Sequence, residues 1–180
     1  MTAPEPTGGG TGDRAGHATG VHVYRGRVAW SGTTADGYAA YDRRHAAALP
    51  DGGLTLPLSS DAAFGGDPAV PNPEQLLVLA AASCHLLSFL AVAARARVAV
   101  LHYTDDAVAE MPDSPSPTGL SRILLRPAVV AVDTVVGRDT PVTEARVQRL
   151  HEVAHAECYV ANSLRTPVVV EPTLTLVHGE

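Results

Sequence analysis

The sequence predicts a single domain of the α+β class, and three observations lead to this prediction. The chain has 180 residues and is 46% apolar, which is enough for one hydrophobic core. Its predicted strands and helices come in separate runs, which favours α+β over a doubly wound parallel sheet. It contains no internal repeat. We expect one domain over residues 21–180, preceded by a Gly-, Pro- and Thr-rich disordered tail over residues 1–20.

Three short strands are the first predicted elements. Residues 21–30 alternate between apolar and polar side chains, which is the period of a strand. Asp36-Gly37 is a turn signal that should lead into a second strand. A further Asp-Gly-Gly turn precedes a third strand over Leu54–Leu58, and the glycines and prolines of residues 59–71 predict a loop.

A long apolar helix is predicted next, over residues 73–95. Asn72 is a favourable N-cap, and Pro73 suits the first position of a helix. The run is long enough to span a membrane, but it contains Ser, Cys and His and lies between amphipathic segments that need a core partner. We therefore expect a buried core helix and no membrane partner.

The second half of the chain predicts strands around one amphipathic helix. Residues 97–111 and 120–132 are strand-like, and Pro127 indicates an edge strand or a bulge. A last strand is expected over residues 166–177. Between them, residues 140–158 have a helical apolar spacing after the N-cap Thr143, with Val147, Leu150, Ala154 and Cys158 on one face.

Charge and cysteine content restrict the possible functions. A net charge of −6 provides no basic surface for nucleic acid. Residues 1–20 lack the apolar segment of a signal peptide, so we expect a cytoplasmic protein, in which permanent disulfides are rare. Cys84 and Cys158 are then either buried thiols that pack as small apolar side chains or a reactive pair.

Two segments that carry these cysteines resemble the OsmC/Ohr family, the osmotically inducible and organic hydroperoxide resistance proteins. The first is Asn-Pro-Glu-Gln-Leu-Leu at residues 72–77, with a cysteine ten residues after the glutamate. The second is HAECYVANSLRTPVVVEP at residues 155–172, in which a cysteine, a serine and Leu-Arg precede the last strand. The resemblance extends over residues 20–175.

The resemblance implies antiparallel sheets wrapped around long central helices in an interlocked homodimer. It also implies a peroxidase for organic hydroperoxides that needs no cofactor or resident metal. Cys84 would attack the peroxide, and Cys158 would resolve the product as a disulfide that a small or lipoyl-type dithiol reduces. Glu74 matches the catalytic carboxylate of the family. The catalytic arginine corresponds to Arg43 or Arg44, and Arg43 is favoured because it fits a Tyr-x-x-Tyr-x-Arg pattern of one branch.

Chemistry adds two expectations to this resemblance. Burial disfavours a thiolate, so a reactive buried cysteine needs a nearby cation, and arginine is always charged. In one continuous helix, Glu74 and Cys84 are separated by about 15 Å along the axis, too far to touch. Either the helix is broken between them, or Glu74 serves the cysteine of a partner subunit.

Other interpretations of the same residues stay open. His151, His155 and Cys158 share one helix face, and they would suit zinc or copper if Cys84 or His85 added a ligand. A non-enzymatic carrier of an apolar ligand is a second alternative. A cysteine hydrolase is disfavoured because no nucleophile-elbow sequence surrounds the first cysteine.

Two residues of the long helix also have purely structural interpretations. Glu74 is equally the first-turn acid that a helix dipole favours. His85 follows Cys84 directly, and neighbouring side chains on a helix do not face each other. We therefore interpret His85 as a core or interface histidine.

Overall fold

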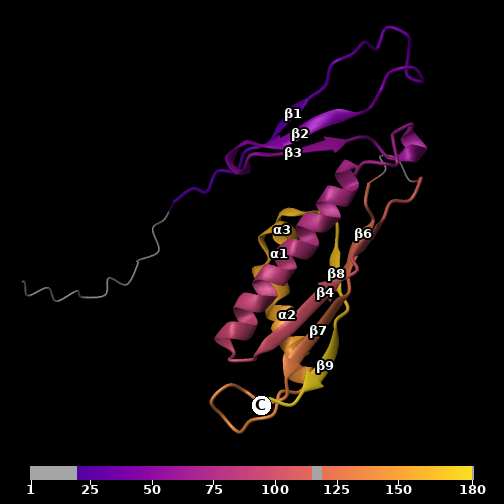
Figure 1. The fold of residues 1–180 in the computed structure, drawn as a ribbon. Coiled ribbons are helices and arrows are strands. Elements are labelled where there is room, and N and C mark those ends of the chain that lie inside the picture. The colour runs from indigo at the N-terminus through magenta and orange to yellow at the C-terminus, as the bar shows by residue number, and fades with distance from the viewer. Residues whose placement is uncertain (1–19, 115–118, 180) are drawn as a thin grey trace, which may run out of the picture.

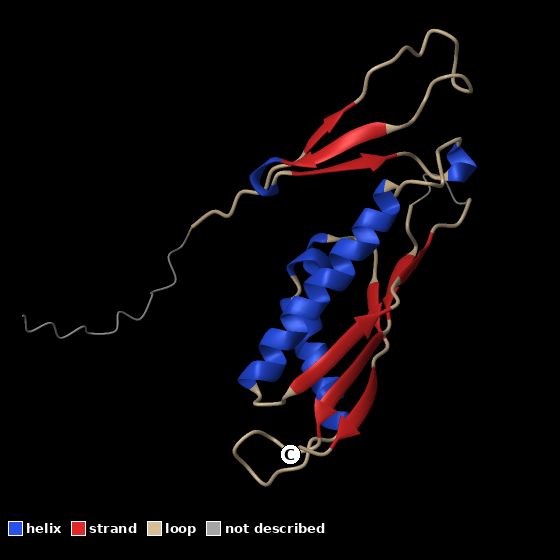
Figure 2. Ribbon diagram, in the orientation of Figure 1, coloured by secondary structure: helices blue, strands red, loops and turns tan. Residues whose placement is uncertain are grey.

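The computed structural model describes residues 20–114 and 119–179, and the expected tail over residues 1–20 lies outside this range except for its last residue. Figures 1 and 2 show a small sheet at one end of the molecule and a body of helices and strands below it. In chain order, the elements are β1 (Arg27–Ala29), β2 (His45–Leu49), η1 (Pro50–Gly52), β3 (Leu54–Leu58), η2 (Ala62–Phe64), α1 (Pro73–Arg95), β4 (Val100–Asp105), β5 (Val108–Glu110), β6 (Arg122–Leu125), β7 (Pro127–Val132), α2 (Glu144–Glu157), α3 (Tyr159–Ser163), β8 (Val168–Val170) and β9 (Thr173–Val177).

The N-terminal sheet has the antiparallel order β1-β2-β3 and stands apart from the body in Figure 1. The third strand has the predicted bounds, and Gly37 forms the predicted turn at φ +90°. The first strand was predicted to begin at residue 21, and this is wrong. Ala48 of β2 pairs with Arg27, and β2 ends one residue later, so residues 21–25 have no strand to pair with.

The helix α1 has the predicted bounds. The Asn72 side chain accepts a hydrogen bond from the Gln75 N–H at 2.8 Å, and the Gln75 side chain accepts one from the Asn72 N–H at 3.0 Å. By length and composition, α1 is also the one described helix that could cross a membrane, and 33% of its apolar window is buried. Complete burial was expected, but only one side of α1 is covered: Leu79 and Leu87 are each 64% exposed.

Two further sheets have the orders β4-β7-β9 and β5-β6-β8. Three segments of the chain each supply one strand to each of these sheets: β4 and β5, β6 and β7, and β8 and β9. The central strands β7 and β6 pair antiparallel with β4 and β5, but parallel with β9 and β8. The expected antiparallel arrangement is therefore wrong on one side of each sheet, because a crossover through α2 joins the parallel strands. The edge position predicted for Pro127 is also wrong: it is buried in a central strand, where it is tolerated as the first residue of β7.

A helical layer, α1 with α2, covers the β4-β7-β9 sheet, and the main core lies between them (Figure 1). Phe89 of α1, Val129 of β7 and Ala154 of α2 are among its fully buried members. The face predicted for α2 is confirmed, because all four of its apolar positions are buried, including Cys158 at the end of the helix. The structure is thus a mixed α+β fold of three small sheets and two long helices.

Candidate active site

The two cysteines come together where α1 passes the junction between α2 and α3. Cys84 is half-buried near the middle of α1, and its Sγ accepts a hydrogen bond from the Val160 N–H at 3.5 Å. Val160 follows Cys158 by two residues, at the start of α3. Both thiols are free in this structure. Side chains that are 74 residues apart in the sequence thus meet at one contact between helices.

Cys158 is the more deeply placed thiol, with 1% of its surface exposed. It ends α2 and begins α3, so the backbone turns at this residue. Burial raises the pKa of the Cys158 thiol, the backbone N–H groups of Ala161 and Val160 partly oppose this, and the nearby Cys84 thiol adds to the rise. The thiol of Cys84 therefore lies against the turn that carries Cys158.

A surface hollow of about 470 Å³ opens beside Cys84. Its walls include Leu87 on the exposed side of α1 and Tyr159 at the start of α3. Arg95 is the cation of this hollow, but its Nη2 already donates to both carboxylate oxygens of Glu157, at 2.7 and 2.5 Å. Within this hollow, therefore, the only described guanidinium is held by a carboxylate.

Arg43 and Glu74 lie in a different hollow, of about 410 Å³, at the N-terminal end of α1. Arg43 comes from the segment before β2, and Glu74 from the first turn of α1. The four predicted catalytic residues thus lie in two places: Arg43 and Glu74 in this hollow, and Cys84 in the other, with Cys158 buried behind it. Because α1 is continuous from Pro73 to Arg95, the first of the two expectations for Glu74, a broken helix, is wrong.

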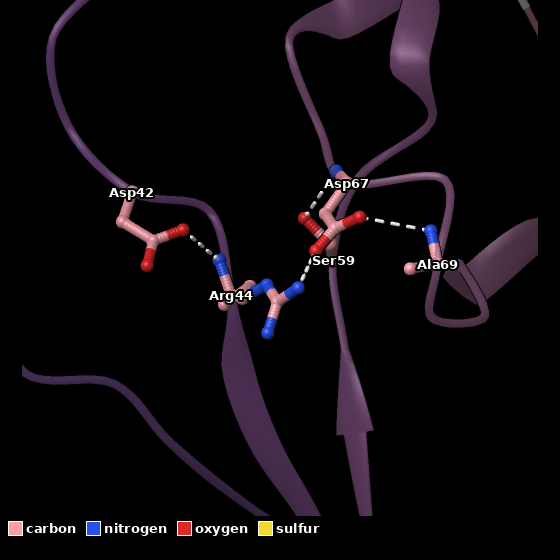
Figure 3. Close-up of polar contacts among 5 residues, drawn as sticks. All are labelled: Asp42, Arg44, Ser59, Asp67 and Ala69. Atoms are coloured by element: carbon pink, nitrogen blue, oxygen red, sulfur yellow. Dashed lines mark hydrogen bonds and ion pairs between the residues drawn. The ribbon is translucent and has the colours of Figure 1, made fainter.

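Arg44, the other candidate arginine, has a different role (Figure 3). Its guanidinium forms an ion pair with Asp67, and its backbone N–H donates to the Asp42 carboxylate at 2.9 Å. The Ala69 N–H and then the Arg44 guanidinium lower the pKa of Asp67, although burial partly opposes them. Arg44 therefore ties the start of β2 to the loop that precedes α1, and Arg43 remains the arginine that faces the hollow.

The histidines do not form the metal site that was considered. His151 is turned toward α1, where its Nδ1 lies 3.0 Å from Nε2 of His85, and its ring stacks on Phe89 with the centroids 3.9 Å apart. Among residues 20–114 and 119–179, no three His, Cys, Asp or Glu side chains are arranged to hold one metal ion. The prediction that His85 is a core histidine is confirmed, since none of its surface is exposed.

The sequence reasoning missed two features near these residues. The guanidinium of Arg43 lies against Tyr38 and Tyr41, and the Tyr-x-x-Tyr-x-Arg spacing was the available signal. An open apolar hollow of about 770 Å³ also lies beside the N-terminal half of α1, with Leu76, Leu79 and Met111 in its walls. No local pattern marks that hollow, because distant segments build it.

Comparisons with known proteins give a consistent family assignment. The family described as OsmC-like protein matches residues 65–173. An OsmC-like protein of unknown function from Vibrio cholerae is 31% identical; the match covers 85% of this chain and 100% of that chain, with a TM-score of 0.72. No curated protein matches the chain.

Two further solved structures share the fold at lower identity. An organic hydroperoxide resistance protein from Elizabethkingia anophelis, with thiocyanate bound, is 18% identical with a TM-score of 0.64, covering 89% of this chain and 100% of that one. An organic hydroperoxide resistance protein OsmC from Legionella pneumophila is also 18% identical, with a TM-score of 0.62 and coverage of 87% and 99%.

Proposed function

The chain belongs to the OsmC-like protein family, and on this premise we propose that it is a thiol-dependent peroxidase that reduces organic hydroperoxides. The position of the Cys84 thiol, against the turn that carries the buried Cys158 thiol, carries this proposal. A half-buried thiol beside a second, deeply buried thiol is the arrangement that a two-cysteine peroxidase needs. The apolar walls of the neighbouring hollows suit an organic substituent on the peroxide.

The proposed reaction uses the two thiols in sequence. The Cys84 thiolate attacks the terminal peroxide oxygen, the O–O bond breaks, and the departing alkoxide takes up a proton to become an alcohol. Cys84 is then a sulfenic acid, which the Cys158 thiol attacks to form a disulfide and release water. An external dithiol reduces that disulfide by thiol–disulfide exchange and restores both thiols.

A cation is required for the first step, and we propose that Arg43 of a second subunit supplies it. Cys84 has only the carboxylate-bound Arg95 in its own hollow, whereas Arg43 and Glu74 share a hollow at the end of the continuous helix. A guanidinium offers a rigid set of donors that can hold a thiolate and a carboxylate together. Two chains packed along α1 in opposite directions would bring each pair against the other.

Exposed apolar surface supports the dimer. Leu79 and Leu87 are exposed on the uncovered side of α1, as they would be if a second copy normally covered them. The N-terminal sheet exposes Val28 and Leu49 and stands away from the body of its own chain. The apolar face of a sheet has to be buried against another element, and a second subunit would provide that element.

Peroxide turnover tests the activity directly. The reduced protein is mixed with cumene hydroperoxide and a dithiol, and the wild type is compared with Cys84→Ser and Cys158→Ser. We expect Cys84→Ser to abolish turnover and Cys158→Ser to allow one stoichiometric reaction before Cys84 is over-oxidised. A wild type whose two thiols ignore the peroxide would refute the proposal, and retention of an apolar ligand by such a protein would favour the carrier.

Mixed dimers test whether the site is shared. Arg43→Ala alone is expected to keep only a low residual turnover, and Cys84→Ser alone none. If Arg43 serves the other subunit, co-refolded one-to-one mixtures regain about a quarter of the wild-type turnover, because half of the dimers are mixed and each has one complete site. If both residues act within one chain, the mixture has no more turnover than its Arg43→Ala component.

A further inference from the structure

The guanidinium of Arg43 is enclosed by two tyrosine rings. Its Cζ lies 4.5 Å from the Tyr38 ring centroid and 4.3 Å from that of Tyr41. The two rings meet nearly at right angles, at 80°, with their centroids 6.1 Å apart. Both distances from the Arg43 Cζ to a ring centroid are within the range at which a cation is attracted to an aromatic face.

Two hydrogen bonds fix the orientation of the same guanidinium. Nη2 donates to the Tyr38 carbonyl at 2.7 Å, and Nη1 donates to the Tyr41 carbonyl at 3.1 Å. An arginine has five N–H donors, so three are left for other partners. None of these contacts neutralises the positive charge, in contrast to the carboxylate contacts of Arg44 and Arg95.

A further side of the guanidinium is covered by Gly65, while the side toward the hollow stays open. A Cβ on this residue would lie 3.2 Å from Cζ and 3.3 Å from Nη1 of Arg43, which is too close for an unshifted side chain. Gly65 also has a φ of +74°, a conformation that favours glycine. The backbone of the loop before α1 thus approaches the arginine as closely as it can.

We propose that Tyr38, Tyr41 and Gly65, here called the Arg43 cage, are positioning residues that hold the catalytic guanidinium in place before substrate arrives. This inference rests on the proposed peroxidase function and adds three residues to its site. Arg43 belongs to the long connection between β1 and β2, and an arginine side chain in such a connection has many rotamers to lose when it is fixed in one orientation. A charge that is already oriented does not incur that cost when the peroxide binds.

The activity test separates ring contact from general damage to the fold. We expect Tyr38→Leu and Tyr41→Leu each to lower kcat/KM for cumene hydroperoxide about tenfold, while the corresponding Phe variants restore it because the ring remains. Tyr24→Leu, an exposed tyrosine outside the cage, is the control and should leave kcat/KM unchanged.

A double variant then asks whether the ring acts through the arginine. In an Arg43→Ala background, Tyr41→Leu should have no further effect on the residual rate. The same tenfold loss in that background, or equal losses for Leu and Phe variants, would overturn the proposal.

A second readout does not depend on activity. Ring currents from two tyrosines should shift the Arg43 Nε–H and Cδ–H signals upfield in the NMR spectrum, and the shift should shrink in the Leu variants but not in the Phe variants. The signals are assigned by their loss in Arg43→Lys. An unshifted Arg43 overturns the cage even if the enzyme is active. A shifted Arg43 in a protein that ignores peroxide means that the proposed function is wrong, while the cage itself is retained.

Discussion

Acid should destabilise this protein through the buried pair His85 and His151. Their ring nitrogens are 3.0 Å apart, and the two side chains are 0% and 1% exposed. Burial, followed by the nearby charge of His155, lowers the pKa of His85 to about 4, and burial together with the charge of His85 lowers the pKa of His151 to about 4. Both imidazoles are therefore neutral in the folded protein at neutral pH.

The sign and size of the effect follow from proton linkage. The unfolded chain binds protons at the ordinary histidine pKa of about 6.5 and the folded chain only near 4, so the stabilisation is complete above about pH 6.5 and is lost as the pH falls toward 4. Between pH 7.5 and 5 the loss is about 2 kcal/mol for each histidine, or about 4 kcal/mol for two independent groups. That is a large part of the 5–15 kcal/mol by which domains are typically stable.

Urea unfolding followed by circular dichroism measures this dependence, at one fixed protein concentration so that any association of chains is the same in every sample. The comparison variant carries His85→Leu and His151→Phe together. Because both histidines are replaced, neither ring nitrogen of the 3.0 Å contact is left buried without its hydrogen-bond partner. Phe at position 151 retains the stacking on Phe89. His102→Gln, at an exposed histidine, is the control.

We expect the free energy of unfolding of the wild type and of His102→Gln to fall by about 4 kcal/mol from pH 7.5 to 5, and that of the double variant to change much less. Asp67 does not interfere with this comparison. Its pKa is lowered in the folded protein, so its contribution to stability is lost only at pH values below 5. A wild type that is equally stable at both pH values, or a double variant with the same slope, would refute the reasoning.

Two further predictions concern the segments that position the site. Asn72→Ala removes one half of the reciprocal hydrogen bonds that begin α1 and should cost about 1–2 kcal/mol of stability, measured by urea unfolding against an Asp36→Ala control in an exposed turn. Asp67→Asn weakens the half-exposed ion pair with Arg44 and should cost at most about 1 kcal/mol, and added salt should narrow the difference from wild type; a larger, salt-independent loss would contradict this.

The parts of the fold that were predicted correctly depend on local signals. The cap at Asn72 and the apolar run after it determine α1 within a single segment, and the apolar spacing of α2 identifies its buried face. That Cys84 would lie against the segment of Cys158 could be expected only from the resemblance, because no local pattern relates side chains on two different helices.

The incorrect predictions concern features that only the folded chain determines. The first strand is short because β2 ends before residues 21–25 can pair with it. Pro127 lies in a central strand because the segment of β6 and β7 is interrupted just before it. The two strands on either side of this interruption belong to different sheets, and Pro127 begins the second one. The histidine spacing on α2 suggested a metal site, but the packing of α2 against α1 gives His151 another histidine as its partner instead.

The half-burial of Cys84 follows from its position on the circumference of α1. Residues three apart on a helix are neighbours, so Cys84 lies beside Leu87, which is exposed, while His85, about 100° around the helix, faces the core. A thiol at this boundary can reach Cys158 within its own chain and, on its other side, whatever covers the exposed face. A cysteine one position later would be buried in the core and could not meet a residue from a second subunit. The position of Cys84 between the buried and the exposed side of α1 therefore allows both parts of the proposal. The thiol can form a disulfide with Cys158 of its own chain, and it can be activated by a cation from a second chain.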